Sequence, residues 1–131
     1  MKGYKGNIEE LVGANELFRQ VLYTARHSQL VIMNLKPLEE IGMEVHDVDQ
    51  FFRFESGEGK VTIDGSEYAV GDGDVVIVPE GAQHNIINTS VSLLLKLYTL
   101  YSPAHHKDKV VHKTKEDALA DSEHFDGITT E

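Results

Sequence analysis

Four side chains that can bind a metal ion occur in two separate stretches of the sequence. Glu44, His46 and Gln50 lie in the first stretch, and His84 lies in the second. Side chains along a β-strand alternate between its two faces, so the first three are expected on one face of a strand. A buried carboxylate without a partner is strongly disfavoured, and a bound cation would provide that partner. The first stretch therefore predicts the inward face of a metal-binding strand.

The residues after Gln50 continue this alternation. Phe52 and Phe54 extend the inward face, whereas the opposite face is charged and suits water, with Asp47, Asp49, Arg53 and Glu55. We expect the two phenylalanines in the core, with one of them able to form the floor of a pocket. Tyr98 and Tyr101, from a later strand, could reach the same cavity. Phe52 and Tyr98 are the candidate substrate-binding residues.

The second stretch, GDGDVVIVPEGAQHNIIN, supplies the other histidine. Its β-branched run at residues 75–78 is typical of a buried strand, which Pro79 would end. Gly81 then permits a tight turn before the chain becomes extended again. His84 can thus point into the same interior as His46.

Both stretches resemble the cupin family, whose two motifs are usually written G-x5-H-x-H-x3,4-E-x6-G and G-x5-P-x-G-x2-H-x3-N. The second motif is matched in full, by Gly73, Pro79, Gly81, His84 and Asn88. The first is matched in part, by His46 and the closing Gly57. Three of its positions are exchanged: Leu38 stands for the opening glycine, Glu44 for the first histidine and Gln50 for the glutamate. The resemblance extends over residues 30–102.

The arrangement of short strands and turns predicts an all-β fold, which the resemblance specifies as a double-stranded β-helix, the cupin jelly-roll barrel. Residues 1–131 form one expected domain, with a barrel core at about 16–102 and a C-terminal arm at 103–131 that carries a short helix at 116–125. ELFRQVLYTA fits a helix or a strand, and we favour a strand paired with QLVIMNLK. Asp64-Gly65 marks the clearest hairpin, and Asn7 could cap one helical turn.

Composition narrows the functional classes. A formal charge of −10 argues against a nucleic-acid or anionic-membrane partner, and the absence of cysteine excludes disulfides and thiol catalysis. The sequence shows no secretory leader and no long apolar run, so a cytoplasmic location is expected. Edge strands and the family resemblance favour a homodimer that acts on a small molecule.

The C-terminal arm contains four of the seven histidines, His105, His106, His112 and His124. These could form a second metal site, but they lie in a polar segment without regular ligand spacing. We therefore expect a surface arm that lies along the barrel or along a neighbouring subunit. The alternative is that the arm covers the mouth of the barrel.

The candidate site is expected to hold one divalent ion: zinc, manganese, iron, nickel or cobalt. Glu44 is either a ligand or a free general base, and Gln50 either binds the metal or orients a bound water. The resemblance to small bacterial cupins related to mannose-6-phosphate isomerase implies an isomerase-like enzyme for a hydroxy-carbonyl substrate. An iron-dependent dioxygenase and a non-catalytic metal- or ligand-binding cupin are the alternatives. No phosphate-binding loop is visible, and Arg53 is expected to face outward.

Overall fold

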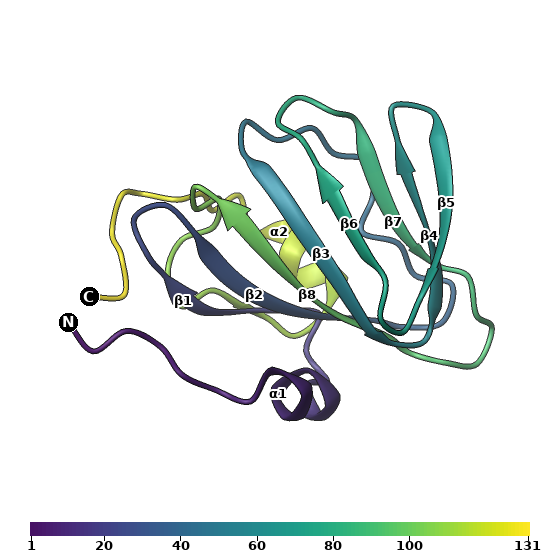
Figure 1. Ribbon diagram of the computed structural model, residues 1–131, viewed down its shortest axis with the longest axis horizontal. Helices are drawn as coiled ribbons and strands as arrows, with labels where there is room; N and C mark the ends of the chain where they lie inside the picture. Colours follow the sequence, from purple (N-terminus) through teal and green to yellow (C-terminus); the bar gives the residue numbers. More distant parts are fainter.

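Two antiparallel β-sheets pack face to face in the computed structural model, which describes residues 1–131 (Figure 1). The larger sheet has the strand order β6-β3-β8-β2-β1-β9, and the smaller has the order β5-β4-β7. The larger sheet comprises β1 (Arg19–Thr24), β2 (Gln29–Leu35), β3 (Asp49–Ser56), β6 (Val75–Val78), β8 (Leu95–Ser102) and β9 (Val111–His112). The smaller comprises β4 (Glu58–Ile63), β5 (Ser66–Gly71) and β7 (His84–Asn88). The predicted all-β jelly roll is confirmed.

Two short helices flank the sheets. The first, α1 (Ile8–Ala14), begins after Asn7, whose side chain accepts a hydrogen bond from Glu10 N at 3.1 Å, so the predicted cap is confirmed. The second, α2 (Lys115–Ala120), is shorter than expected and does not continue to residue 125. Neither helix could cross a membrane.

The core lies between the inward faces of the two sheets. Residues of β3 and β8 alternate as expected, and every second side chain is buried. On β3 the buried residues are Gln50, Phe52 and Phe54, and on β8 they are Leu95, Leu97, Thr99 and Tyr101. The inward face is therefore apolar toward one end and polar toward the other, where Gln50 pairs with Tyr101.

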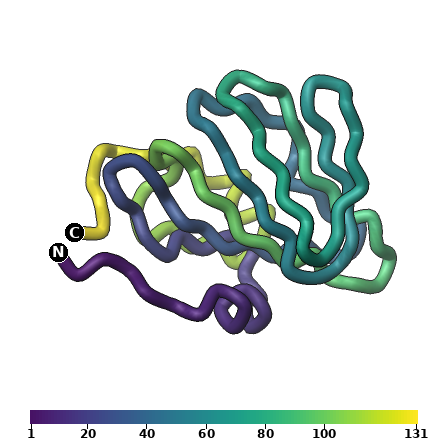
Figure 2. The backbone as a smooth tube through the Cα atoms, viewed as in Figure 1, coloured from purple at the N-terminus to yellow at the C-terminus, as the bar shows by residue number.

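Both predicted hairpins are present. β1 pairs with β2 in antiparallel register, which confirms the strand at ELFRQVLYTA. β4 and β5 are joined by Asp64 and Gly65, which both have positive φ, as a two-residue hairpin turn requires. The termini also meet, because the Glu131 side chain accepts a hydrogen bond from Gly3 N (Figure 2).

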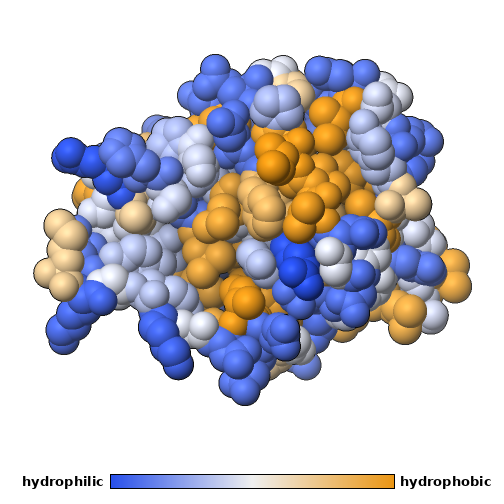
Figure 3. All heavy atoms as spheres, viewed as in Figure 1, coloured by the Kyte–Doolittle hydropathy of each residue, from blue (hydrophilic) through white to orange (hydrophobic).

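Two expectations about strands were wrong. The strand predicted from Glu44 onward begins at Asp49, and Glu44 lies in a separate segment that pairs with β7. The run at 75–78 is not a buried strand, because β6 forms the edge of the larger sheet and leaves Val75 and Ile77 54% and 65% exposed. Apolar residues gather on this face of the molecule (Figure 3). The expected homodimer stays a prediction.

The turn between β3 and β4 depends on a close backbone approach. Gly57 has a φ of 94°, and a Cβ atom there would lie 2.3 Å from the carbonyl oxygen of Leu94. Gly65 has a similar φ of 85°, but a Cβ atom there would meet nothing within 4 Å. Both positions favour glycine through their backbone conformation. Of the two, only position 57 also lacks the space for a Cβ atom.

We predict that Gly57→Ala lowers the free energy of unfolding by about 2–4 kcal/mol, through backbone strain and overlap with the Leu94 carbonyl. Gly65→Ala is the matched control and should cost about 1 kcal/mol, from φ alone. Urea unfolding of both variants measures the difference. Equal losses would show that the contact at Leu94 is unimportant.

Candidate metal centre

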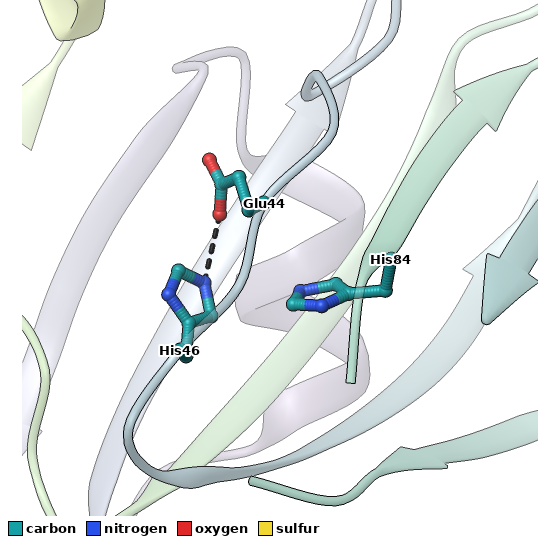
Figure 4. Close-up of side chains that lie close together, drawn as sticks. All are labelled: Glu44, His46 and His84. Atoms are coloured by element: carbon teal, nitrogen blue, oxygen red, sulfur yellow. Dashed lines mark ion pairs between the residues drawn. The ribbon is translucent and has the colours of Figure 1, made fainter. Parts of the chain in front are cut away.

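A pair of backbone hydrogen bonds places Glu44 opposite His84. Glu44 N donates to His84 O at 2.8 Å, and His84 N donates to Glu44 O at 2.9 Å. Residues that are directly opposite in an antiparallel pair project to the same face of the sheet. The carboxylate and the imidazole therefore enter the interior together (Figure 4).

His46 reaches the same point from the loop that precedes β3. Its carbonyl oxygen accepts a hydrogen bond from Gly81 N at 2.9 Å, which ties this loop to the turn before β7. Its ring centroid lies 5.1 Å from that of His84, and its Nε2 lies 2.7 Å from Glu44 Oε2. One ligand atom from each of Glu44, His46 and His84 lies within 4.8 Å of the others. Three of the four predicted ligands thus converge.

The orientation of His84 is fixed by a hydrogen bond to the backbone. Its Nδ1 lies 3.0 Å from the carbonyl oxygen of Ala82, which can only accept, so Nδ1 carries the proton. Nε2 then retains its lone pair. Histidines that bind a metal through one ring nitrogen usually donate a hydrogen bond from the other.

The contact between Glu44 and His46 leaves an unsatisfied atom. His46 Nε2 is buried and makes no hydrogen bond of acceptable geometry, although the carboxylate is near. Burial raises the pKa of Glu44, but the adjacent His46 together with Arg19 and His84 outweighs it and holds that pKa below its usual value. Glu44 is therefore a carboxylate. A carboxylate and two imidazoles around a common point fit a divalent metal ion.

Gln50 lies in the same interior and has a free acceptor. Its Nε2 donates to Thr99 Oγ1 at 3.0 Å, while its buried Oε1 has no partner. This hydrogen bond fixes which amide atom is available, and it is the oxygen, the one able to bind a metal. The role of Gln50 as a fourth ligand or as an anchor for water stays a prediction.

The two candidate substrate-binding residues are placed differently. Phe52 is buried, with its ring centroid 6.4 Å from that of His84, so it borders the cluster. Tyr98 projects from the opposite face of β8 to Tyr101 and packs near Phe51, at 6.3 Å between ring centroids. The sequence alone does not show which of the alternating side chains of β8 point inward. The expectation that Tyr98 reaches the cavity is therefore corrected.

The C-terminal arm folds back over the cluster. The ring of His105 lies 4.2 Å from that of His46 and 5.2 Å from that of Tyr101, measured between centroids. Burial and the neighbouring His46 and His106 lower the pKa of His105 to about 4. The expectation of an arm confined to the surface is therefore corrected, and the alternative, an arm over the site, is observed.

Buried polar contacts hold the arm in this position. Gln29 Oε1 accepts from His106 N at 2.9 Å, and Gln29 Nε2 donates to His106 O at 2.7 Å. The carboxylate of Glu123 binds His106 Nδ1 and also accepts from Lys107 N at 2.7 Å. The hydrogen bond from His106 leads the causes that lower the pKa of Glu123 to about 2, against the opposing effect of burial. Histidines that looked scattered in sequence are thus fixed individually.

Sequence reasoning missed two residues of this interior, His105 and Arg19. His105 follows the last barrel strand by three residues, and its proximity to the inward Tyr101 was the available signal. Arg19 alternates with the inward Val21 of β1, but the sequence of this segment fits a helix or a strand, so its inward face could not be assigned from sequence.

Comparison with known proteins agrees with this geometry. A family model described as "Cupin domain" matches residues 31–101. The chain belongs to the cupin family. Its relatives include the uncharacterised protein YrkC of Bacillus subtilis, which is 40% identical over 126 residues that cover 91% of this chain and 67% of YrkC.

Solved structures show the same cupin fold. The crystal structure of BH2720 from Bacillus halodurans superposes with a TM-score of 0.89 at 35% identity and covers 92% of this chain and 96% of that one. An RmlC-like cupin from Shewanella frigidimarina gives 0.61 at 24% identity and covers 66% and 75%. The high score of BH2720 extends the likeness beyond the barrel to the segments that flank it.

Removing the charge of Glu123 should loosen the arm of this cupin. We predict that Glu123→Gln lowers the free energy of unfolding at pH 7 by about 1–3 kcal/mol, because charge-assisted hydrogen bonds to His106 and Lys107 are lost. The folded-state pKa of Glu123 lies below its unfolded value of 4.5, so wild type has this stabilisation above pH 4.5 and loses it as the pH falls toward about 2. The difference in the free energy of unfolding between wild type and Glu123→Gln should therefore become smaller below pH 4.5.

Chemical unfolding at several pH values measures this gap. Glu116→Gln is the control, because Glu116 is exposed in the first turn of α2. A gap that is constant between pH 7 and pH 3 would contradict the assigned role of the carboxylate.

Proposed function

We propose that this cupin binds one divalent metal ion through Glu44, His46 and His84, with Gln50 as the fourth ligand, and acts as an isomerase-like enzyme on a hydroxy-carbonyl substrate. The observation that carries the proposal is the convergence of a carboxylate and two imidazoles on one point, where His46 Nε2 lies 2.7 Å from Glu44 Oε2 without a hydrogen bond of acceptable geometry. A divalent ion bound between these groups would satisfy the imidazole nitrogen and the carboxylate together. The proposed ion is zinc, manganese, iron, nickel or cobalt.

The bound ion would act as a Lewis acid on the adjacent oxygens of the substrate. The protein would then have to move one proton between neighbouring carbon atoms. Glu44 could be this base only if it were not a ligand, because metal binding lowers the basicity of its carboxylate. His105 lies over His46 and is not one of the three converging groups, so it is the imidazole available to take up the proton and return it.

The surroundings of His105 suit a closed reaction site. Its backbone is tied to Gln29, and its ring packs between those of His46, Tyr101 and His106. Such packing partly shields the ring from water, which would otherwise exchange the transferred proton and weaken electrostatic interactions. The arm thus contributes both a covering segment and a candidate base.

The ligand set also supports a second function. Two histidines and one carboxylate with open positions are the set used by iron-dependent oxygenases. In that case, substrate turnover would require ferrous iron and oxygen. An isomerase reaction consumes no oxygen, so the two functions are separated by the same assay with and without it.

We predict that untagged wild-type protein binds about one divalent ion per chain, measured by elemental analysis after dialysis against each metal. Glu44→Gln and His84→Ala should each weaken binding by at least roughly tenfold, because each removes a ligand. His124→Ala is the control, because His124 is exposed. Unchanged metal content in both ligand variants would contradict the proposed site.

We further predict that His105→Phe abolishes proton transfer while leaving metal content unchanged. The test is deuterium uptake from D₂O at the carbon beside the carbonyl group, measured on a panel of aldose–ketose pairs with metal-loaded protein. The variant keeps an aromatic ring against His46 but has no nitrogen, so the rate should fall by roughly 10²–10⁴-fold.

Tyr98→Phe is the control for this assay, because Tyr98 lies on the outer face. Oxygen consumption without deuterium uptake would favour the dioxygenase. Absence of both activities would leave a metal-binding protein without catalysis.

A further inference from the structure

The outer face of the larger sheet carries a row of apolar side chains that crosses four strands. Phe51 of β3 lies opposite Ile77 of β6 on one side and opposite Leu100 of β8 on the other, and Leu100 lies opposite Leu30 of β2. Residues directly opposite one another in antiparallel strands project to the same face. Because the neighbouring Phe52 faces the core, these side chains face outward. We call them the apolar row: Ile77, Phe51, Leu100 and Leu30.

This face is open on the side of β6. Ile77 is 65% exposed, and Val75, two residues before it on the same face, is 54% exposed. On the β2 side of the same face, Ile32 is only 3% exposed, because the segment with α1 packs there (Figure 1). Figure 3 shows apolar side chains gathered over β3 and β6. The chain therefore covers one side of this sheet face and leaves the other apolar and exposed.

Two opposite charges flank the apolar row on β3. The outward side chains of this strand include Asp49, Phe51 and Arg53 in that order, so an acid precedes the row and a base follows it. Asp49 is exposed. The Nε of Arg53 makes no hydrogen bond, and the carboxylate of Glu55 lies 3.9 Å from it. The guanidinium thus retains donors for a further carboxylate.

This order of charges is self-complementary. A twofold axis along the apolar row would reverse the direction of β3 in a second copy that packs face to face with the first. Arg53 of each copy would then lie opposite Asp49 of the other, and each residue of the row would lie opposite its own equivalent. One arrangement thus covers the exposed Ile77 and forms two identical ion pairs.

The position of α1 agrees with an axis at the level of Phe51. Glu9 and Gly13 of α1 line one surface pocket together with Arg53 and Glu55, so the helix lies beside the Glu55 end of β3. An axis nearer to Glu55 would bring the second copy onto this helix. An axis at Phe51 instead places the helix beyond the start of β3 in the second copy.

We propose that the outer face formed by β3, β6 and β8 is the interface of a homodimer, in which a second copy of this chain packs against it about a twofold axis along the apolar row. The sequence favours a homodimer but does not locate its interface. The proposal is independent of the proposed function, because Gln50 and the metal cluster lie on the inward side of the sheet.

The oligomeric state in solution, measured by sedimentation equilibrium, is the first test. Wild type should have twice the mass of one chain. Ile77→Ser should raise the dissociation constant of the dimer by at least roughly tenfold, because Ile77 would meet its own equivalent at the axis. Val91→Ser is the matched control, because Val91 is 80% exposed in the loop between β7 and β8 and lies outside the apolar row.

Two charge variants test the twofold arrangement. Arg53→Asp places acids at both positions and Asp49→Arg places bases at both, so each variant alone puts like charges opposite one another and should be monomeric. An equimolar mixture should form heterodimers, detected by native mass spectrometry, because every acid then meets a base. The double variant Arg53→Asp/Asp49→Arg should dimerise with itself. Arg53→Asp/Glu116→Arg has the same net charge and should stay monomeric, because Glu116 lies in α2.

Circular dichroism checks that each variant is folded, and Ile77→Ser still tests the face if a charge variant is not. Monomeric wild type would overturn the inference and leave this face to a different partner. A dimer that survives both Ile77→Ser and Arg53→Asp would overturn it by placing the interface elsewhere. Loss of the dimer without rescue in the mixture or in the double variant would overturn the twofold arrangement. Metal content, which these variants should leave unchanged, reports on the proposed function separately.

Discussion

The antiparallel pairing of Glu44 with His84 is the constraint on which the site depends. Two backbone hydrogen bonds fix the positions of the two side chains on one face, whatever the side chains themselves do. His46 is then brought in by its own carbonyl, which binds Gly81 N in the turn before β7. Three candidate ligands from two chain segments are thus set by backbone contacts of the barrel, so their geometry does not rely on a bound ion.

The C-terminal arm pairs several polar groups of the barrel interior. Gln29 uses both ends of its amide on the backbone of the arm, and Glu123 binds His106. The Gln29 contacts join the barrel to a segment far away in sequence, and the Glu123 contact joins two parts of that segment, so the covering of the site and the fold of the tail are one structural feature. The atoms that stay unpaired are then informative, since they are exceptions in a network that is otherwise satisfied.

Much of the fold and part of the site were accessible from sequence. The match to the second motif located His84, and strand alternation correctly buried Gln50 and Phe52, because both signals are local. The same local reasoning failed for Val75 and Ile77, since a β-branched run reports strand propensity and not whether a neighbouring strand covers it. Local reasoning could not place His105 either. The contacts that hold the arm come from Gln29 and Glu123, and no repeating sequence pattern relates these residues to His105.

The charges of the interior would nearly balance one another around a bound ion. Glu44 is the carboxylate of the candidate metal centre, a divalent ion there would add two positive charges, and the buried Arg19 adds one more. Glu123 is engaged by His106 and Lys107 N, and Asp121 reaches Arg19 only through His112. Those hydrogen bonds do not remove the negative charge of Glu123, so Glu44 and Glu123 together would balance the two charges of a divalent ion and leave only that of Arg19. Negative charge that develops on metal-bound oxygens of a substrate would then be stabilised mainly by the ion itself, most strongly in the transition state.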